Sequence, residues 1–313
     1  LKEQDVDGLV IDLRNNGGGS LSTVVDIAGL FIKEGPIVQV KSNGADSEIL
    51  KDKDPEILWD KPLVIMVNEI SASASEILAA AMQDYKRAVI IGSKQTYGKG
   101  TVQNVYDLNR WLRQNDLGDM GALKITTQKF YRINGGSTQL EGVKSDVVVP
   151  DRFSYIDIGE KDLDNPLPWD KIAAADYEVW DGYIDYDQTI SNSNARMAKN
   201  KQLQLIEENA KWIKSKQDDS VWPLNIDAYA AKMEQNEAEA KRFDDLRNYE
   251  SGLTFKSLPY EIKKFENDTV LKQKRERWHE DLAKDVYMDE AINVLEDLKV
   301  NNIRRGKLAD VRD

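Results

Sequence analysis

The sequence contains no cysteine and a single histidine, and these absences remove several kinds of chemistry. Without cysteine, disulfide bonds, thiolate nucleophiles and cysteine-based zinc sites are excluded. The lone histidine, His279, stands in the charged stretch 272–284, which has the pattern of an exposed helix. We interpret it as a solvated helix residue. Any hydrolytic mechanism in this chain would therefore work without imidazole, the commonest general base.

Long apolar runs are also missing. No stretch approaches the roughly 18 apolar residues that span a bilayer, and no signal peptide is present. The sequence therefore predicts no transmembrane segment. The first residues, 1–8, run directly into a strand pattern, which we interpret as an N-terminal truncation.

Positive charge is scarce relative to negative charge. The 313 residues include 43 Lys and Arg against 55 Asp and Glu, for a net charge of −12. Nucleic acids and anionic lipids are bound by clustered Lys and Arg. The charge balance therefore predicts no nucleic-acid partner.

The first 150 residues alternate strand-like and helix-like segments. Two segments have helical spacing of their apolar residues, 21–31 and 75–85. Strand patterns are expected at 9–13, 37–40, 63–67, 88–91, 101–108 and 123–133. Such alternation is typical of an α/β sheet covered by helices.

The composition changes after about Pro150. Residues 151–192 begin with a stretch rich in Asp, Pro and Gly, and we expect a linker or an extended wrap there. From residue 193 to 313, Glu, Lys, Ala and Leu dominate with helical periodicity. The sequence therefore predicts a helical C-terminal domain, with helices over 195–216, 226–249, 258–286 and 289–298.

One segment that could carry catalytic residues is the serine-rich stretch 68–76, between a predicted buried strand and a predicted helix. At such a junction the unpaired N–H groups and the dipole of the helix can stabilise a developing oxyanion near Ser73. The same residues also fit a capping box, because Glu76 follows Ser73 by three positions. The alternating small residues favour catalysis, since they leave room for a substrate backbone.

A second segment, 96–103, carries a lysine between two glycines at the start of a strand. Strand periodicity predicts that Lys99, Thr101 and Gln103 share a face. A buried lysine beside a serine can act as a general base if desolvation lowers its pKa. A lysine in a surface turn is the alternative interpretation.

Phosphate-binding and metal-binding sites fit the sequence poorly. A Walker A motif has four residues between its first glycine and its Gly-Lys pair, whereas five follow Gly92 here, and Gly100 occupies the position of the metal-binding hydroxyl. With one histidine, no cysteine and no EF-hand loop, only carboxylate cages remain for a metal. The sequence predicts no metal and no cofactor.

Long stretches of the chain resemble the carboxy-terminal processing proteases, and most closely their tail-specific branch. The matching stretches are 8–20, 71–84, 97–103, 129–138 and 159–169. The resemblance implies a serine endopeptidase with a crotonase-like or ClpP-like core of mixed sheet and helices. It is dense from about residue 9 to 169 and weaker through the helical tail.

The resemblance implies a role for particular residues. It implies Ser73 as the nucleophile rather than Ser71 or Ser75, Lys99 as the general base and Gln103 as the residue that orients the lysine. It implies an oxyanion hole formed by Gly18 and the amide of Ala74. Three further positions match residues that support the site: Glu76, Asp84 and Thr96.

Two features qualify the match. Asp84 lies eleven residues after Ser73, which on one helix is about 16 Å. We therefore expect it to pack at the helix end or to pair with Lys86 or Arg87, and not to join a triad. The loop before Lys99 is one residue longer than the family pattern, which gives a spacing of twenty-six from Ser73.

The resemblance also implies partners and a location. Substrates would be proteins with flexible C-termini in the bacterial envelope, captured by a PDZ domain that this sequence does not contain. An envelope adaptor protein and a periplasmic or exported, possibly membrane-associated, location belong to the same expectation. Two alternatives remain open: a scaffold that binds partners without catalysis, and an acyl-CoA enzyme on a crotonase-like core.

Overall fold

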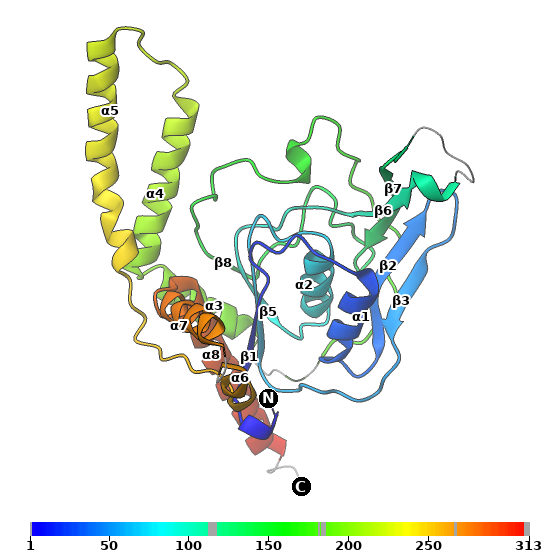
Figure 1. Cartoon of the computed structure of the whole chain (residues 1–313). Coiled ribbons are helices and arrows are strands. Elements are labelled where there is room, and N and C mark those ends of the chain that lie inside the picture. The colour runs from blue at the N-terminus through cyan, green and yellow to red at the C-terminus, as the bar shows by residue number, and fades with distance from the viewer. Residues whose placement is uncertain (1, 112–117, 181, 183–185, 266–267, 310–313) are drawn as a thin grey trace.

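The computed structural model describes residues 2–111, 118–180, 182, 186–265 and 268–309 of the chain. Two four-stranded sheets form the first part of the molecule (Figure 1). The first sheet is parallel, in the order β1 (Leu9–Asp12), β4 (Leu63–Val67), β5 (Val89–Gly92) and β8 (Val147–Val148). The second is antiparallel, in the order β3 (Glu48–Asp52), β2 (Gly35–Ser42), β7 (Ala122–Tyr131) and β6 (Thr101–Asp107).

Two helices, α1 (Leu21–Gly29) and α2 (Ala74–Asp84), contribute to a hydrophobic core with one face of the parallel sheet and the antiparallel sheet. The predicted apolar face of α1 is confirmed, because Val24, Ala28 and Phe31 are buried in this core. All five residues of β4 are buried, as expected for a parallel strand that is covered on both faces.

The remaining helices follow the two sheets. They are α3 (Tyr186–Met197), α4 (Lys201–Asp218), α5 (Ile226–Ala240), α6 (Pro259–Phe265), α7 (Thr269–Ala283) and α8 (Val286–Ala309). Short 3-10 helices are η1 (Lys2–Gln4), η2 (Leu108–Trp111), η3 (Glu160–Asp162) and η4 (Lys241–Asn248). The predicted α/β core followed by a mostly helical region is therefore confirmed.

A second hydrophobic core joins the helices to the parallel sheet. Val64 and Met66 of β4 lie in it together with Ala291, Val294 and Leu298 of α8. Helix α8 thus buries its apolar stripe against the sheet, as a helix of marginal intrinsic stability requires. None of the helices in the described ranges is long and apolar enough to cross a membrane.

The predicted helix boundaries in this region are wrong in several places. The helix expected over 195–216 is divided, because the Asn200 side chain caps α4 by accepting hydrogen bonds from the N–H groups of Gln202 and Leu203. The helix expected over 258–286 is also divided, and Asp268 caps α7. Helix α3 begins at Tyr186, inside the range that was expected to be extended.

Helices α4 and α5 form an arm that projects from the rest of the molecule (Figure 1). Ion pairs such as Lys216 with Glu239, at 2.7 Å, join the two helices. Near the foot of the arm, the rings of Trp212 and Phe243 lie 5.6 Å apart. The arm is therefore a two-helix unit with its own packing contacts.

Candidate active site

Three loops meet at the carboxyl ends of β1, β4 and β5. We call residues 13–20 the first loop, 68–75 the second loop and 93–100 the third loop. The N–H of Ala72 donates to the carbonyl of Asn16 at 3.0 Å, which joins the first and second loops. The N–H of Tyr97 donates to the carbonyl of Ser71 at 3.0 Å, which joins the second and third. The parallel sheet thus brings together segments that are far apart in the sequence.

Ser73 occupies a strained turn at the start of α2. Its φ of 58° and ψ of −115° lie in a region that non-glycine residues adopt rarely and at an energetic cost. Strained conformations of this kind cluster at functional sites. The turn places Ser73 at the N-terminal end of the helix, where N–H groups lack partners in the helix.

The hydroxyl groups of the neighbouring serines are already engaged. Ser71 is fully buried and its Oγ donates to the carbonyl of Leu13 at 2.8 Å. The Oγ of Ser75 donates to the carbonyl of Asn16 at 3.0 Å. Ser73 forms a capping box with Glu76, in which its Oγ faces the Glu76 N–H, but within the described ranges the Ser73 hydroxyl donates to no acceptor and is half-exposed. Of the three serines, Ser73 is the one whose hydroxyl is available for reaction.

Glu76 connects the second loop to the third. Its Oε2 accepts hydrogen bonds from the N–H groups of Ser73 at 2.8 Å and Lys99 at 3.0 Å. Its Oε1 accepts from the Thr96 hydroxyl at 2.6 Å and from the Gly98 N–H at 2.7 Å. Thr96 in turn accepts from the N–H of Val143 at 2.8 Å, so its hydroxyl proton is free for Glu76. One buried carboxylate therefore fixes the backbone of Ser73 relative to that of Lys99.

Burial and hydrogen bonding act on Glu76 in opposite directions. The side chain is fully buried, and desolvation raises its pKa to about 7. The hydrogen bonds from Thr96, Gly98, Ser73 and Lys99 lower the pKa, because they stabilise the ionised form. The carboxylate is ionised above this value and then accepts from all four donors.

Lys99 is half-buried and its ammonium group lies near Gln103. Lys99 Nζ donates to Gln103 Oε1 at 3.1 Å. Desolvation, and next the positive charge of Lys124, lower the pKa of Lys99, while Glu160 and Glu76 raise it. A lower pKa makes the neutral amine more accessible. No hydrogen bond joins Lys99 Nζ to Ser73 Oγ in this conformation of the described residues.

The strand that follows Lys99, β6, pairs with β7 through an irregular register in which Thr127 of β7 has no partner residue on β6. A register irregularity between Val102 and Gln103 interrupts the pairing of β6 with β7. Thr101 is buried whereas Gln103 is exposed. The contact of Lys99 with Gln103 agrees with the expectation that these side chains share a face, and the place of Thr101 on that face stays a prediction.

Gly18 lies directly against the Ser73 turn. A Cβ atom at Gly18 would come within 2.7 Å of the Ala74 nitrogen and 2.8 Å of the Ser73 Cβ, and the φ of Gly18 is +98°. A side chain would not fit here, and the two amides assigned to the oxyanion hole are close together. The Gly18 N–H donates to Asn16 Oδ1 at 2.9 Å in this conformation.

Asp84 stands at the other end of α2 and takes no part in the site. It forms an ion pair with Arg132 at 2.6 Å and accepts a further hydrogen bond from Asn134 at 2.8 Å. The predicted pairing with Lys86 or Arg87 is therefore wrong. Arg87 is fully buried and donates instead to backbone carbonyls, including that of Phe31 at 2.9 Å.

Two residues that the sequence did not single out support the third loop. The Gly100 N–H donates to Gln139 Oε1 at 2.8 Å, and the Thr138 hydroxyl donates to the carbonyl of Lys99 at 3.0 Å. Both lie within or beside the stretch 129–138 that carried the family resemblance, but no local pattern connected them with Lys99. Among the described residues, no cluster of three His, Asp or Glu side chains could hold a metal ion.

Comparisons with known proteins identify the families that the two parts of the chain match. Residues 1–149 match the model of peptidase family S41, and residues 153–300 match the C-terminal domain of tail specific protease. The first part of the chain therefore belongs to peptidase family S41. The second part carries the domain that is characteristic of the tail-specific proteases within it.

Individual relatives have related names. The chain is 42% identical over 250 residues to the tail-specific protease of Haemophilus influenzae. The matched region covers 79% of this chain and 35% of that protein. It is 37% identical over 163 residues to the carboxy-terminal-processing protease of Bartonella bacilliformis. This matched region covers 50% of this chain and 35% of the relative. The chain thus spans about a third of the length of these relatives.

A solved structure named photosystem II D1 C-terminal processing protease is 34% identical to the chain, with a TM-score of 0.41. It covers 47% of this chain, and the match covers 36% of that protein.

Proposed function

We propose that the chain is the catalytic part of a serine endopeptidase that uses a Ser73–Lys99 dyad. The observation that carries the proposal is the Ser73 hydroxyl, whose proton has no acceptor among the described residues, in a strained turn that Glu76 ties to the backbone of Lys99. Membership of peptidase family S41 supports it.

In the proposed mechanism, the neutral amine of Lys99 takes the proton of Ser73 as Oγ attacks the carbonyl carbon of a peptide bond. The carbonyl oxygen becomes the oxyanion and accepts hydrogen bonds from the N–H groups of Gly18 and Ala74. The Lys99 ammonium then gives its proton to the leaving amine. Water, deprotonated by the same lysine, hydrolyses the acyl-enzyme and releases the second product.

Two side chains would move in order to start this reaction. Lys99 Nζ now donates to Gln103, and the Gly18 N–H now donates to Asn16. Both hydrogen bonds involve side-chain acceptors, which can rotate away without changing the backbone of the three loops. Catalytic hydrogen bonds commonly tighten only in the complex with substrate.

Protein substrates with flexible C-termini, in the bacterial envelope, complete the proposal. The names of the bacterial relatives, tail-specific protease and carboxy-terminal-processing protease, support this substrate class. A periplasmic or exported location and an envelope adaptor are part of the same proposal and rest on the family alone.

The test is cleavage of a disordered reporter protein. Ser73→Ala should abolish cleavage and leave the thermal unfolding midpoint almost unchanged, because the Ser73 hydroxyl donates to no acceptor in the described structure and the variant keeps the hydrogen bond from the backbone N–H to Glu76. Ser71→Ala and Ser75→Ala should keep activity, and each should lower stability by about 1 kcal/mol, because each hydroxyl donates to a carbonyl. Full activity of the Ser73→Ala variant would refute the assignment of the nucleophile.

A further inference from the structure

A large cavity lies between the parallel sheet and the helical arm. Its volume is about 800 Å³, within the range of ligand-binding pockets. It opens at the carboxyl ends of β1, β4 and β5, since residues at the end of each strand line it. Four aromatic side chains contribute to its wall: Phe153, Trp212, Phe243 and Tyr287.

Part of the cavity wall is formed by the first, second and third loops. Asn15 of the first loop, Asn68 of the second and Ser93 of the third all line it. Asn15 and Asn68 also hold each other: the Asn15 N–H donates to Asn68 Oδ1, and Asn68 Nδ2 donates to Asn15 Oδ1, both at 2.9 Å. The cavity therefore reaches the three loops at these residues, while Ser73 and Lys99 do not line it.

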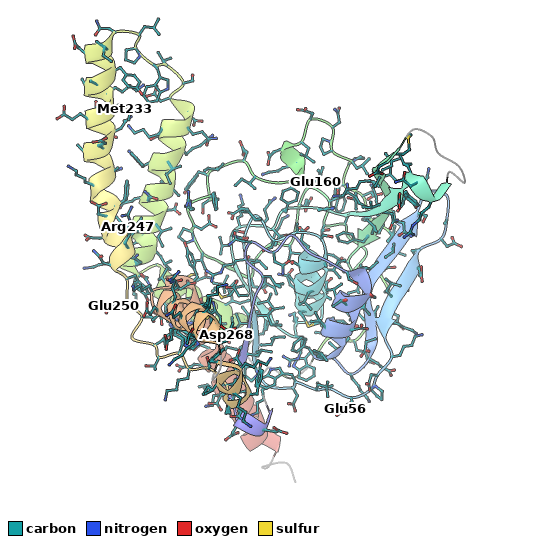
Figure 2. The ribbon with its side chains drawn as sticks, in the orientation of Figure 1. Glu56, Glu160, Met233, Arg247, Glu250 and Asp268 are labelled. Atoms are coloured by element: carbon teal, nitrogen blue, oxygen red, sulfur yellow. The ribbon has the colours of Figure 1, made fainter. Side chains whose placement is uncertain are left out.

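The outer wall belongs to the arm. Ile206, Asn209, Trp212 and Ile213 of α4 line the cavity, so one face of this helix is turned toward the core. Figure 2 labels Arg247, another lining residue, at the foot of the arm. Apolar and aromatic groups thus extend from the catalytic loops outward along α4.

Exposed apolar side chains also occur at the far end of the arm, separated from the cavity by the polar residues 214–220. At its tip, Leu224 is fully exposed and Ile226 is 74% exposed. Lys232 holds the tip in place, because its Nζ donates to the carbonyl of Val221 at 2.6 Å and lies 4.5 Å from the ring of Trp222. An ordered loop that presents aliphatic groups to water is suited to contact apolar side chains of another polypeptide.

The charged groups of the cavity favour an apolar occupant over an ionic one. Arg14 is paired with Asp12 and with Asp285, both at 2.7 Å, so its charge is already balanced. Arg152 stands over the ring of Phe153 at 5.0 Å. Three arginines and three aspartates line the cavity, so its charges balance: Arg14, Arg152 and Arg247 against Asp12, Asp151 and Asp244.

We propose that this cavity binds an extended segment of the substrate polypeptide that carries large apolar side chains and lies outside the residues at the scissile bond. This inference rests on the proposed function and specifies its substrate class: unfolded chains long enough to reach both the catalytic loops and the wall formed by α4. A short peptide that contacts only the catalytic loops does not use the cavity.

The first test uses a substitution on α4 that places a larger side chain in the cavity. Asn209→Trp places a bulky ring in the cavity, whereas Glu208→Trp is a matched control, because Glu208 is the exposed neighbour and does not line the cavity. The measured quantity is the ratio of kcat/KM for a long disordered protein to kcat/KM for a short peptide. Asn209→Trp should lower this ratio about 10-fold, the effect of losing one or two apolar contacts in a pocket, and Glu208→Trp should leave it unchanged.

The second test needs no cavity substitution. A disordered substrate with a photoreactive benzophenone side chain at one apolar position is bound to the Ser73→Ala variant, irradiated and mapped by mass spectrometry. Adducts should appear in the peptides that contain Trp212, Phe243 or Tyr287. Adducts that avoid these peptides, or that join two copies of this chain there, would overturn the inference.

The two tests separate the inference from the proposed function. If the unmodified protein cleaves neither substrate, the proposed function fails, while the adducts still decide whether the cavity binds polypeptide. If it cleaves both, and Asn209→Trp matches Glu208→Trp in the ratio, the inference about the cavity fails and the proposed function stands.

Discussion

Replacement of Glu76 by glutamine tests how the nucleophile and the base are held together. The substitution preserves the size of the side chain and removes one of its two acceptor oxygens. In one orientation of the amide, its NH₂ group faces the N–H groups of Ser73 and Lys99. In the other orientation it faces Thr96, which can accept a hydrogen bond, and the N–H of Gly98. At least one buried backbone N–H therefore loses its partner.

The magnitude follows from the cost of a buried donor without an acceptor, about 1–3 kcal/mol for each. Glu76→Gln should therefore lower the free energy of unfolding by about 1–3 kcal/mol. We would measure it by urea denaturation at a pH below the pKa of about 7 that burial gives Glu76, where the carboxyl group is neutral like the amide and no cost of burying a charge offsets the loss. The cleavage activity of the folded enzyme should also fall, because Ser73 and Lys99 lose a common anchor.

Glu56→Gln is the matched control, since Glu56 is exposed and its carboxylate has no partner among the described residues (Figure 2). Surface substitutions of this kind change stability by about 0.5 kcal/mol or less. If Glu76→Gln changes the free energy of unfolding no more than Glu56→Gln does and retains full cleavage activity, the reasoning about Glu76 is refuted.

Two further predictions concern Lys99. Lys99→Arg should be as inactive as Lys99→Ala in peptide cleavage, because a guanidinium keeps its proton in proteins and cannot act as a base; turnover by the Arg variant would make Lys99 an electrostatic residue. Lys124→Gln removes a positive charge that lowers the pKa of Lys99, so this pKa should rise. The ascending limb of the pH profile of kcat/KM should then move to higher pH, and an unmoved limb would contradict the role of Lys99 as base.

The local patterns of the sequence predicted the elements that hold the site. The apolar spacing of 21–31 and 75–85 gave α1 and α2 within two residues of their observed bounds. Strand β4, at Leu63–Val67, matches its prediction without change. These elements have strong periodicity or a continuous apolar run, and such signals depend on neighbouring residues only.

Elements with weak local signals were missed. Strand β3, at Glu48–Asp52, is mostly exposed and charged, and β8 has two residues. Both exist because they pair with β2 and β5, which lie elsewhere in the sequence. The division of the expected helix at Asn200 was missed for another reason: the capping residue stands within an otherwise continuous helical pattern.

The pairing of Asp84 shows the same limit in a side chain. Charged residues two and three positions away were the obvious partners, but Asp84 pairs with Arg132, forty-eight positions later in the chain. The position of Arg132 after β7 brings it to the end of α2. No spacing rule contains that information.

The sequence by itself determined that a serine-rich junction and a glycine-flanked lysine exist, that thiolate chemistry is excluded, and that one histidine alone could supply an imidazole. It left three serines as chemically equivalent candidates until the family resemblance chose among them. Only the tertiary structure separated them physically: the hydroxyls of Ser71 and Ser75 donate to carbonyls of the first loop, and that of Ser73 does not. The physical reason is that parallel pairing of β1 with β4 brings the first loop against the second, so the acceptors that engage two serines come from a distant part of the chain.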